Sequence, residues 1–273
     1  MIVLWLNQSM RWIYLSPHLD DAVLSAGGLI YEQVQSGIPV EIWTLMSGFP
    51  PKDEEYSFLA QKNHLDWGYS SAEETVRARR AEDVTAANIL GAKTVHFDFL
   101  DCIYRRGRNG EWLYNIVSVL PEDDGADLSA RSMKAITSLP HVDDEGLPRK
   151  IADAISPRLK SDDKLVCQLS VGSHVDHVLV RQAAELLGWN LIYDIDVPYI
   201  FTKPEELAQK SAGMQENVHS VTKSSLKSWK VAVLAYASQL PVLGDAMKTP
   251  EKATESIQSY WTAHRGIRLF QLN

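Results

Sequence analysis

The sequence predicts an α/β fold, a Rossmann-like, doubly wound and mostly parallel sheet with helices on both faces. Short apolar runs alternate with longer amphipathic runs along much of the chain. The short runs are nearly continuous in their apolar character, which is typical of parallel strands that are covered on both faces. The chain has 273 residues, of which 45% are hydrophobic and 23% charged, as in an ordinary globular protein.

The first elements follow in order from residue 12. Trp12–Leu15 is an apolar run of strand length, and the helical pattern after it repeats its apolar positions on one face and stops at Gly37. Pro39–Met46 is a second strand candidate, bounded by turn residues. Ser71–Glu74 has the form of a capping box, so it opens a long helix, and Gly91 ends that helix.

The same alternation continues to residue 195. Thr94–Phe99 predicts the third strand, and a helical stretch near Arg149–Leu159 leads to Lys164–Leu169 as the fourth. The helix that follows repeats its apolar positions on one face and ends at Gly188. Leu191–Ile195 is then the fifth strand, and strands that alternate with helices favour a parallel sheet.

We expect residues 1–273 to form a single α/β domain. Residues 103–146, rich in Arg, Gly, Asp and Ser, predict an irregular insertion over the scaffold. Residues 200–273 are expected to be mainly helical, with Ile267–Leu272 as a candidate last strand. The sequence carries no signal for the oligomeric state, and a homo-oligomer is compatible with it.

Charge and composition exclude several classes of protein. Lys and Arg total 27 against 35 for Asp and Glu, a formal net charge of -8, so the basic footprint of a nucleic-acid binder is missing. No apolar stretch approaches the ~20 residues that a membrane span needs. Cys102 and Cys167 lie in apolar surroundings and are expected to be two buried free thiols, the alternative being one disulfide. We therefore expect a cytoplasmic protein without a nucleic-acid partner or a membrane span.

Two unusually polar loops directly follow predicted strands, at residues 16–21 and 172–177. Because parallel strands end at one edge of a sheet, both loops are expected to face the same crevice. They supply three imidazoles and three carboxylates, from His18, Asp20, Asp21, His174, Asp176 and His177. A catalytic zinc ion needs three nitrogen or oxygen ligands and a fourth position for water. The loops therefore predict a metal site with carboxylates to spare for proton transfer.

Two simpler interpretations stay open for these residues. Asp20-Asp21 at the start of a helix is commonly an N-cap that compensates the helix dipole. A nucleotide-binding protein on the same scaffold would need Gly-x-Gly-x-x-Gly after a strand, whereas this chain offers Gly27-Gly28 inside a predicted helix.

The two loop motifs, in this order, resemble the PIG-L/LmbE-like family of zinc-dependent N-acetylglucosaminyl deacetylases. The first runs from Ser16-Pro-His18-Leu-Asp20-Asp21 to Gly28, and the second is His174-Val-Asp-His177. A third element, Arg79-Arg-Ala-Glu82 leading to Leu90-Gly91, is similar to the Arg-x-x-Glu…Leu-Gly helix of the family. The likeness extends over about residues 11 to 200.

The resemblance implies a metal site and a base. His18, Asp21 and His177 would be the zinc ligands, and Asp20 would deprotonate the water on the metal. Two imidazoles and one carboxylate also suit iron, manganese or nickel, so other divalent metals fit the same ligands.

Four more residues take roles from the same resemblance. His174 would stabilise the oxyanion and protonate the departing amine, and Asp176 would orient it and favour its charged form. Arg79 and Asp101 match positions that hold sugar hydroxyls. For Arg79, an ion pair with Glu82 on an exposed helix face is an equally simple interpretation.

The implied function is metal-dependent hydrolysis of an N-acetyl or other N-acyl group on a small-molecule amino sugar or glycoconjugate. An amidase acting on another small N-acyl metabolite and a catalytically inactive sugar-binding relative are the alternatives. The chain departs from the family motif at Leu19, where Pro is usual, and at Ala22, where Glu is usual. Neither residue is among the implied ligands, so we expect the site to survive both changes, with the substrate subclass in question.

Overall fold

The computed structural model describes residues 10–52, 55–115, 128–137 and 139–272. Within these residues, seven strands form one sheet in the order β3-β2-β1-β4-β5-β7-β6. The strands are β1 (Trp12–Ser16), β2 (Val40–Thr44), β3 (Lys93–His96), β4 (Lys164–Gln168), β5 (Ile192–Asp194), β6 (Met214–Ser220) and β7 (Gly266–Leu272). Strands β1 to β5 are parallel to one another, whereas β7 is antiparallel to both β5 and β6. The predicted mostly parallel α/β fold is thus confirmed.

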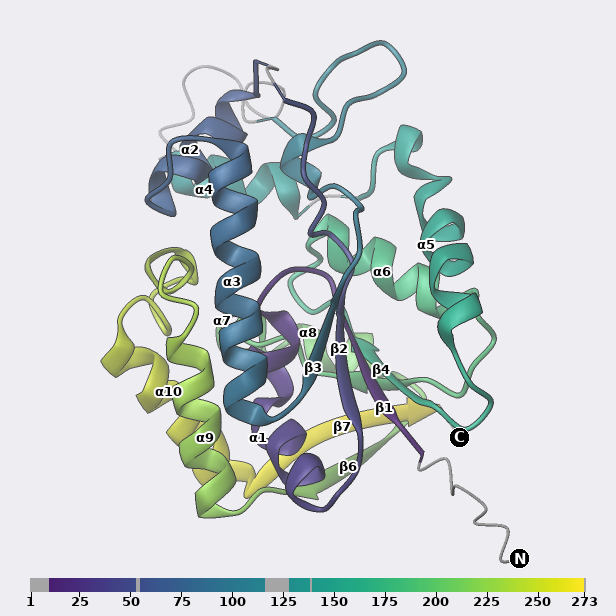
Figure 1. The fold of residues 1–273 in the computed structure, drawn as a ribbon, viewed down its shortest axis with the longest axis vertical. Helices are drawn as coiled ribbons and strands as arrows, with labels where there is room; N and C mark the ends of the chain where they lie inside the picture. The colour runs from purple at the N-terminus through teal and green to yellow at the C-terminus, as the bar shows by residue number, and fades with distance from the viewer. Residues whose placement is uncertain (1–9, 53–54, 116–127, 138, 273) are drawn as a thin grey trace, which may run out of the picture.

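Helices cover both faces of the sheet, as Figure 1 shows: α3, α9 and α10 lie on one side and α5 and α6 on the other. The α-helices of the described residues are α1 (Asp21–Gln35), α2 (Phe58–Asp66), α3 (Ala72–Leu90), α4 (Leu128–Ile136), α5 (Leu147–Ile155), α6 (Val175–Glu185), α7 (Tyr199–Thr202), α8 (Glu206–Lys210), α9 (Lys223–Leu234) and α10 (Pro250–His264). Short 3-10 turns are η1 (Cys102–Tyr104), η3 (Val142–Asp144), η4 (Ser156–Arg158) and η5 (Leu240–Val242).

The capping chemistry read from the sequence sets the ends of α3. The Ser71 hydroxyl accepts a hydrogen bond from the Glu74 amide at 3.2 Å, which satisfies one free donor of the first turn. Gly91 ends the helix in the left-handed conformation, with φ of 76°. This long helix carries Arg79 on its buried side.

Close packing explains the two consecutive glycines of α1. A side chain at Gly27 would overlap the indole ring of Trp229 on α9, and Gly28 faces the same ring. The indole nitrogen of Trp229 donates to the Val23 carbonyl at 2.8 Å, so α9 lies directly against α1. Gly27-Gly28 therefore allows the close packing of α1 and α9, so these glycines no longer support the nucleotide-binding alternative.

The structure contains elements that the sequence did not predict. The edge strand β6 is mostly exposed, so its residues show neither an apolar run nor a clean alternation. Helix α2 buries few side chains, which leaves a weak helical period. The candidate last strand is confirmed as β7, so the part of the chain after residue 200 combines helices with two strands of the sheet.

Both cysteines are buried and free, as expected. Of the helices that the structure describes, not one combines the length and the apolar character that a membrane crossing requires.

Candidate metal and catalytic centre

The strand order creates the crevice in which the site lies. The chain leaves β1 toward β2 on one side and returns as β4 on the other, so β1 and β4 flank the point at which the winding reverses. The loops after these two strands are where doubly wound sheets bind ligands. The Ser16 hydroxyl shapes the first loop, because it donates to the His18 carbonyl at 2.7 Å and accepts from the Ala22 amide at 3.1 Å.

The structure brings the three implied metal ligands together. Oδ2 of Asp21 lies 3.2 Å from Nδ1 of His18 and 3.3 Å from Nε2 of His177. The His18 amide also donates to this oxygen at 2.8 Å, which fixes the carboxylate in the turn. The three side chains are buried. One oxygen of Asp21 thus lies within 3.3 Å of a ring nitrogen of each histidine, and the three side chains come from two loops.

Each of these imidazoles is held from its other edge by a buried carboxylate. Nε2 of His18 lies 3.0 Å from Oδ2 of Asp176, and Nδ1 of His177 lies 2.9 Å from Oδ1 of Asp196. Because an ionised carboxylate only accepts hydrogen bonds, the contacting nitrogens carry the protons. In the neutral form of each imidazole, the lone pair is then left on the nitrogen that faces Asp21. This carboxylate–imidazole arrangement is the one that orients histidines at metal ions.

A buried ring nitrogen without a hydrogen-bond partner indicates that a cation fits between these residues. Nε2 of His177 is buried and has no hydrogen-bond partner, although it faces Asp21. Burial lowers the pKa of His177, but the charges of Asp21 and Asp196 outweigh it and raise the pKa to about 9. A proton or a metal ion would supply the positive charge that this position favours. The donor set of His18, Asp21 and His177 therefore fits a divalent cation.

His174 extends the same cluster. Ring nitrogens of His18, His174 and His177 lie within 4.8 Å of one another, so three imidazoles line the centre. The Asp176 amide donates to Nδ1 of His174 at 3.2 Å, which leaves Nε2 as the protonated, donating nitrogen. Burial, together with the charges of the two other histidines, lowers the pKa of His174 well below its usual range. His174 is thus a neutral hydrogen-bond donor.

The contacts of Asp176 differ from those that the sequence implied. Its carboxylate holds His18, the Cys102 amide and Arg105, whereas its backbone amide is what contacts the His174 ring. Its charge favours the protonated form of His174, but burial and the neighbouring imidazoles outweigh that effect. The carboxylate orients His18, and the neutral form of His174 prevails.

Asp20 has a different environment from its neighbour Asp21. It stands at the N-cap position of α1, yet its side chain makes no capping hydrogen bond. The carboxylate accepts no hydrogen bond from any residue in the described part of the chain, and it is 5% exposed. Burial and the charge of Asp21 raise the pKa of Asp20 to about 7. Asp20 therefore occupies the N-cap position without making the capping bond, and a carboxylate with this pKa can exchange protons near neutral pH.

Arg79 and Asp101 lie at the edge of the same centre. Nη1 of Arg79 is 3.9 Å from Oδ2 of Asp101, which is itself 3.9 Å from Nε2 of His18. The Arg79 guanidinium lies over the ring of Trp67 at 4.6 Å, and its buried Nε has no partner. Glu82 instead accepts hydrogen bonds from Ser238. The interpretation of Arg79 as an exposed ion pair with Glu82 is wrong.

Asp196 and Arg105 are site residues that the sequence analysis missed. Asp196 follows β5, the parallel neighbour of β4, so its loop reaches the same edge of the sheet. Two aspartates at the end of a predicted strand were the signal that could have indicated it. Arg105 lies at the start of the irregular segment, where no motif marks it.

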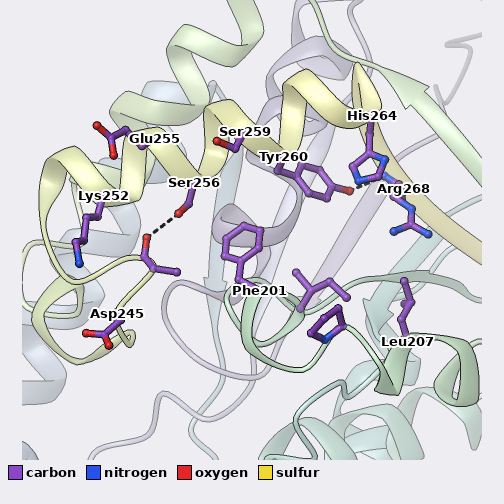
Figure 2. Close-up of a pocket in the computed structure, with 13 residues that line it drawn as sticks. Phe201, Leu207, Asp245, Lys252, Glu255, Ser256, Ser259, Tyr260, His264 and Arg268 are labelled. Atoms are coloured by element: carbon purple, nitrogen blue, oxygen red, sulfur yellow. Dashed lines mark hydrogen bonds between the residues drawn. The ribbon is translucent and has the colours of Figure 1, made fainter.

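A separate cavity of about 690 Å³ lies between α7 and α10 (Figure 2). Phe201 and Leu207 contribute apolar walls, while Ser259, Tyr260 and other polar side chains come from α10. Not one of the eight site residues implied by the sequence lines this cavity, although the structure describes all eight. The chemistry-bearing residues and this cavity are distinct features.

Comparisons with known proteins agree with the geometry. A family model described as PIG-L, GlcNAc-PI de-N-acetylase, matches residues 13–187. The zinc-inhibited form of teicoplanin deacetylase Orf2 has a TM-score of 0.78 at 27% identity, with 96% of this chain and 97% of that chain covered. The A40926 pseudoaglycone deacetylase Dbv21 has a TM-score of 0.65 at 26% identity, with 97% of both chains covered.

A more distant structure shares the fold alone. The N,N'-diacetylchitobiose deacetylase from Pyrococcus horikoshii has a TM-score of 0.52 at 15% identity, covering 97% of this chain and 82% of that chain. Among curated proteins, no sequence matches this chain significantly. The family model covers more than half of the chain, including both site loops, and the chain belongs to the PIG-L family of N-deacetylases.

Proposed function

We propose that this deacetylase hydrolyses the N-acetyl group of an amino sugar that is part of a larger glycoconjugate, with zinc as its metal. One observation carries the proposal: Asp21 and the free ring nitrogens of His18 and His177 converge, and a buried carboxylate backs each imidazole. Three ligands of this kind leave positions open for water and substrate.

The three ligand residues would hold the cation, and the rest of the centre would handle protons and charge. A divalent cation supplies positive charge that acidifies a water molecule and polarises the acyl carbonyl. Asp20 would accept a proton from the attacking water, since its pKa of about 7 places it between its two forms near neutral pH.

His174 would act on the opposite side of the acyl group. Because Nδ1 accepts from the Asp176 amide, Nε2–H would be free to donate a hydrogen bond to the carbonyl oxygen as negative charge develops there. Because the neutral imidazole keeps only the Nε2 proton and its Nδ1 accepts from the Asp176 amide, the proton that reaches the leaving nitrogen would be the one that Asp20 took from the attacking water. Asp176 fixes both imidazoles, one through its carboxylate and one through its amide.

The substrate class follows from Arg79 and from the relatives. The guanidinium of Arg79 and the carboxylate of Asp101, whose side chains are 8% and 13% exposed, offer donors and an acceptor at the edge of the centre, as sugar hydroxyls require. Two of the similar structures are named as deacetylases of teicoplanin and of the A40926 pseudoaglycone, and they cover nearly all of this chain. We therefore favour a conjugated amino sugar over a free monosaccharide.

The test measures acetate and free-amine release from N-acetylglucosamine, an N-acetylglucosaminyl glycopeptide and an N-acetylglucosaminyl lipid. We expect release from at least one conjugate, with Asp20→Asn lowering kcat by about 10²- to 10⁴-fold while metal content persists. His177→Ala should lose both metal and activity, and Asp98→Asn, on an exposed side chain, should change neither.

Other results would favour the alternatives. Sugar binding without acetate release would indicate an inactive sugar-binding relative. Hydrolysis confined to small N-acyl amides without a sugar would indicate another amidase. The single-domain organisation, the cytoplasmic location and the lack of a nucleic-acid partner stay predictions from the sequence, and a homo-oligomer stays compatible with it.

A further inference from the structure

Arg105 is a buried cation next to the candidate centre. It directly follows η1, and 7% of its surface is exposed. Its Nη1 donates to Oδ1 of Asp176 at 2.5 Å and to the Leu100 carbonyl at 3.1 Å, and its Nε donates to Oδ2 of Asp144 at 3.0 Å. A buried guanidinium is stable only where acceptors compensate its charge. The two carboxylates therefore fix its position from opposite sides.

The contact with Asp176 determines how that carboxylate is oriented. Oδ1 is bound by Arg105, while Oδ2 accepts from the Cys102 amide at 3.0 Å and contacts Nε2 of His18 at 3.0 Å. Because both oxygens are engaged and the side chain is fully buried, the carboxylate cannot turn without losing one of these bonds. Arg105 thus orients Asp176, and Asp176 orients His18.

The contact with Asp144 links Arg105 and Asp176 to the far end of the stretch at 103–146. Arg105 lies near the beginning of that segment and Asp144 near its end. The Tyr114 hydroxyl donates to Oδ2 of Asp144 at 2.8 Å and accepts from the His141 amide at 3.0 Å. The Arg105 guanidinium also lies over the Tyr114 ring at 5.2 Å. The two ends of the segment therefore meet at the Arg105 side chain.

We propose that Arg105 and Asp144 are positioning residues that hold Asp176 in the orientation in which it supports His18, so that these two residues control how tightly the centre binds its cation. The inference rests on the proposed function insofar as it takes His18 as a metal ligand. Partners of this kind behind a ligating histidine typically change metal affinity by about 10- to 100-fold.

The direction of the effect follows from charge. Asp144 and Asp176 both compensate the positive charge of Arg105. Without the Asp144 charge, the guanidinium would be compensated by Asp176 alone, and Asp176 would have less negative charge to offer to His18. A less basic imidazole binds a cation more weakly. If the ion pair served only to anchor the segment, its loss would lower the melting temperature and leave cation affinity unchanged.

The experiment compares Asp144→Asn with Asp143→Asn in the full chain. Asp143 is the adjacent carboxylate, but it accepts from the Arg108 amide at 2.9 Å and has no contact with Arg105. Zinc affinity is measured by competition with a chromophoric chelator, and the site is also loaded with cobalt for its visible absorption spectrum. We expect Asp144→Asn to bind zinc roughly tenfold more weakly and to alter the cobalt spectrum. Asp143→Asn should match the wild type in both.

Arg105→Lys is measured alongside, because it keeps the charge but lacks the planar fork that reaches both carboxylates. Because Lys cannot hold Asp176 and Asp144 together, Arg105→Lys should also weaken zinc binding. If Asp144→Asn does not fold, the zinc affinity of Arg105→Lys tests the proposal. The proposal is overturned if the folded variants bind zinc as the wild type does, or if Asp143→Asn weakens binding equally. Failure of the proposed metal site looks different: the wild type and His177→Ala would then have the same zinc affinity.

Discussion

Replacing Asp196 by Asn tests whether a carboxylate behind His177 prepares the site for a metal. Asp196 accepts two hydrogen bonds, from Nδ1 of His177 at 2.9 Å and from the Val171 amide at 3.0 Å. An Asn side chain has one accepting oxygen, so it can satisfy one of these donors and must present an NH₂ group to the other. If the NH₂ group faces His177, the ring must accept at Nδ1, and its proton moves to Nε2, the nitrogen that should bind the metal.

The magnitude of this change follows from the buried position of all three groups. Losing the partner behind a metal-binding histidine lowers metal affinity by about 10- to 100-fold, or roughly 1.4 to 2.8 kcal/mol. We therefore expect Asp196→Asn to weaken zinc binding in that range, measured by competition with a chelator of known affinity at pH 7.5.

The control for this measurement is Asp98→Asn. The Asp98 side chain is 84% exposed and pairs with Arg80 on the surface, so the Asp98→Asn variant should have the same zinc affinity as the wild type. Equal zinc affinity for Asp196→Asn and the wild type would refute the reasoning, because the His177 tautomer would then not depend on Asp196.

Three further changes have expected outcomes. Asp20→Asn should stabilise the metal-free protein at pH 8, and less at pH 5, in thermal unfolding. Folding raises the Asp20 pKa to about 7, so ionisation of Asp20 destabilises the folded wild type. This destabilisation increases between about pH 4 and pH 7, to at most about 4 kcal/mol. If Asp20→Asn raised stability equally at pH 5 and pH 8, the reasoning would be contradicted. Gly27→Ala should lower stability by about 1–3 kcal/mol through overlap with Trp229, whereas Gly146→Ala, with open space around it, should change it by under about 0.5 kcal/mol. Arg79→Lys should raise KM for the conjugate more than it lowers kcat, since Lys loses the planar contacts of the guanidinium; an unchanged KM would exclude Arg79 from the substrate site.

The sequence was sufficient to predict which loops meet, because the rule for parallel sheets depends only on strand order and direction. His18 and His177 are far apart in the chain, yet each directly follows a strand or opens the next helix. The ends of the elements were less certain. The third strand was predicted to reach Phe99, whereas β3 ends at His96.

The residues behind the ligands could not be predicted in the same way. Asp196 contacts His177 only because the loop after β5 turns back, with a positive φ of 55° at Asp196 itself. Arg105 and Asp144 are 39 residues apart, so their pairing is a long-range contact that depends on the tertiary fold. Local pattern carries no information about contacts of this kind.

Adjacent aspartates in one motif acquire different chemistry from their surroundings. Asp21 receives the His18 amide and faces two imidazoles; burial raises its pKa, but the charge of His177 outweighs that effect and lowers the pKa well below its usual range. Asp20 lacks such donors, and the charge of Asp21 is one of the causes that raise its pKa to about 7. The ionised carboxylate of Asp21, which we propose as a cation ligand, therefore also raises the proton affinity of Asp20 beside it. A cation bound to Asp21 would offset that charge, so the same pair of residues links metal binding to the proton affinity of the candidate base.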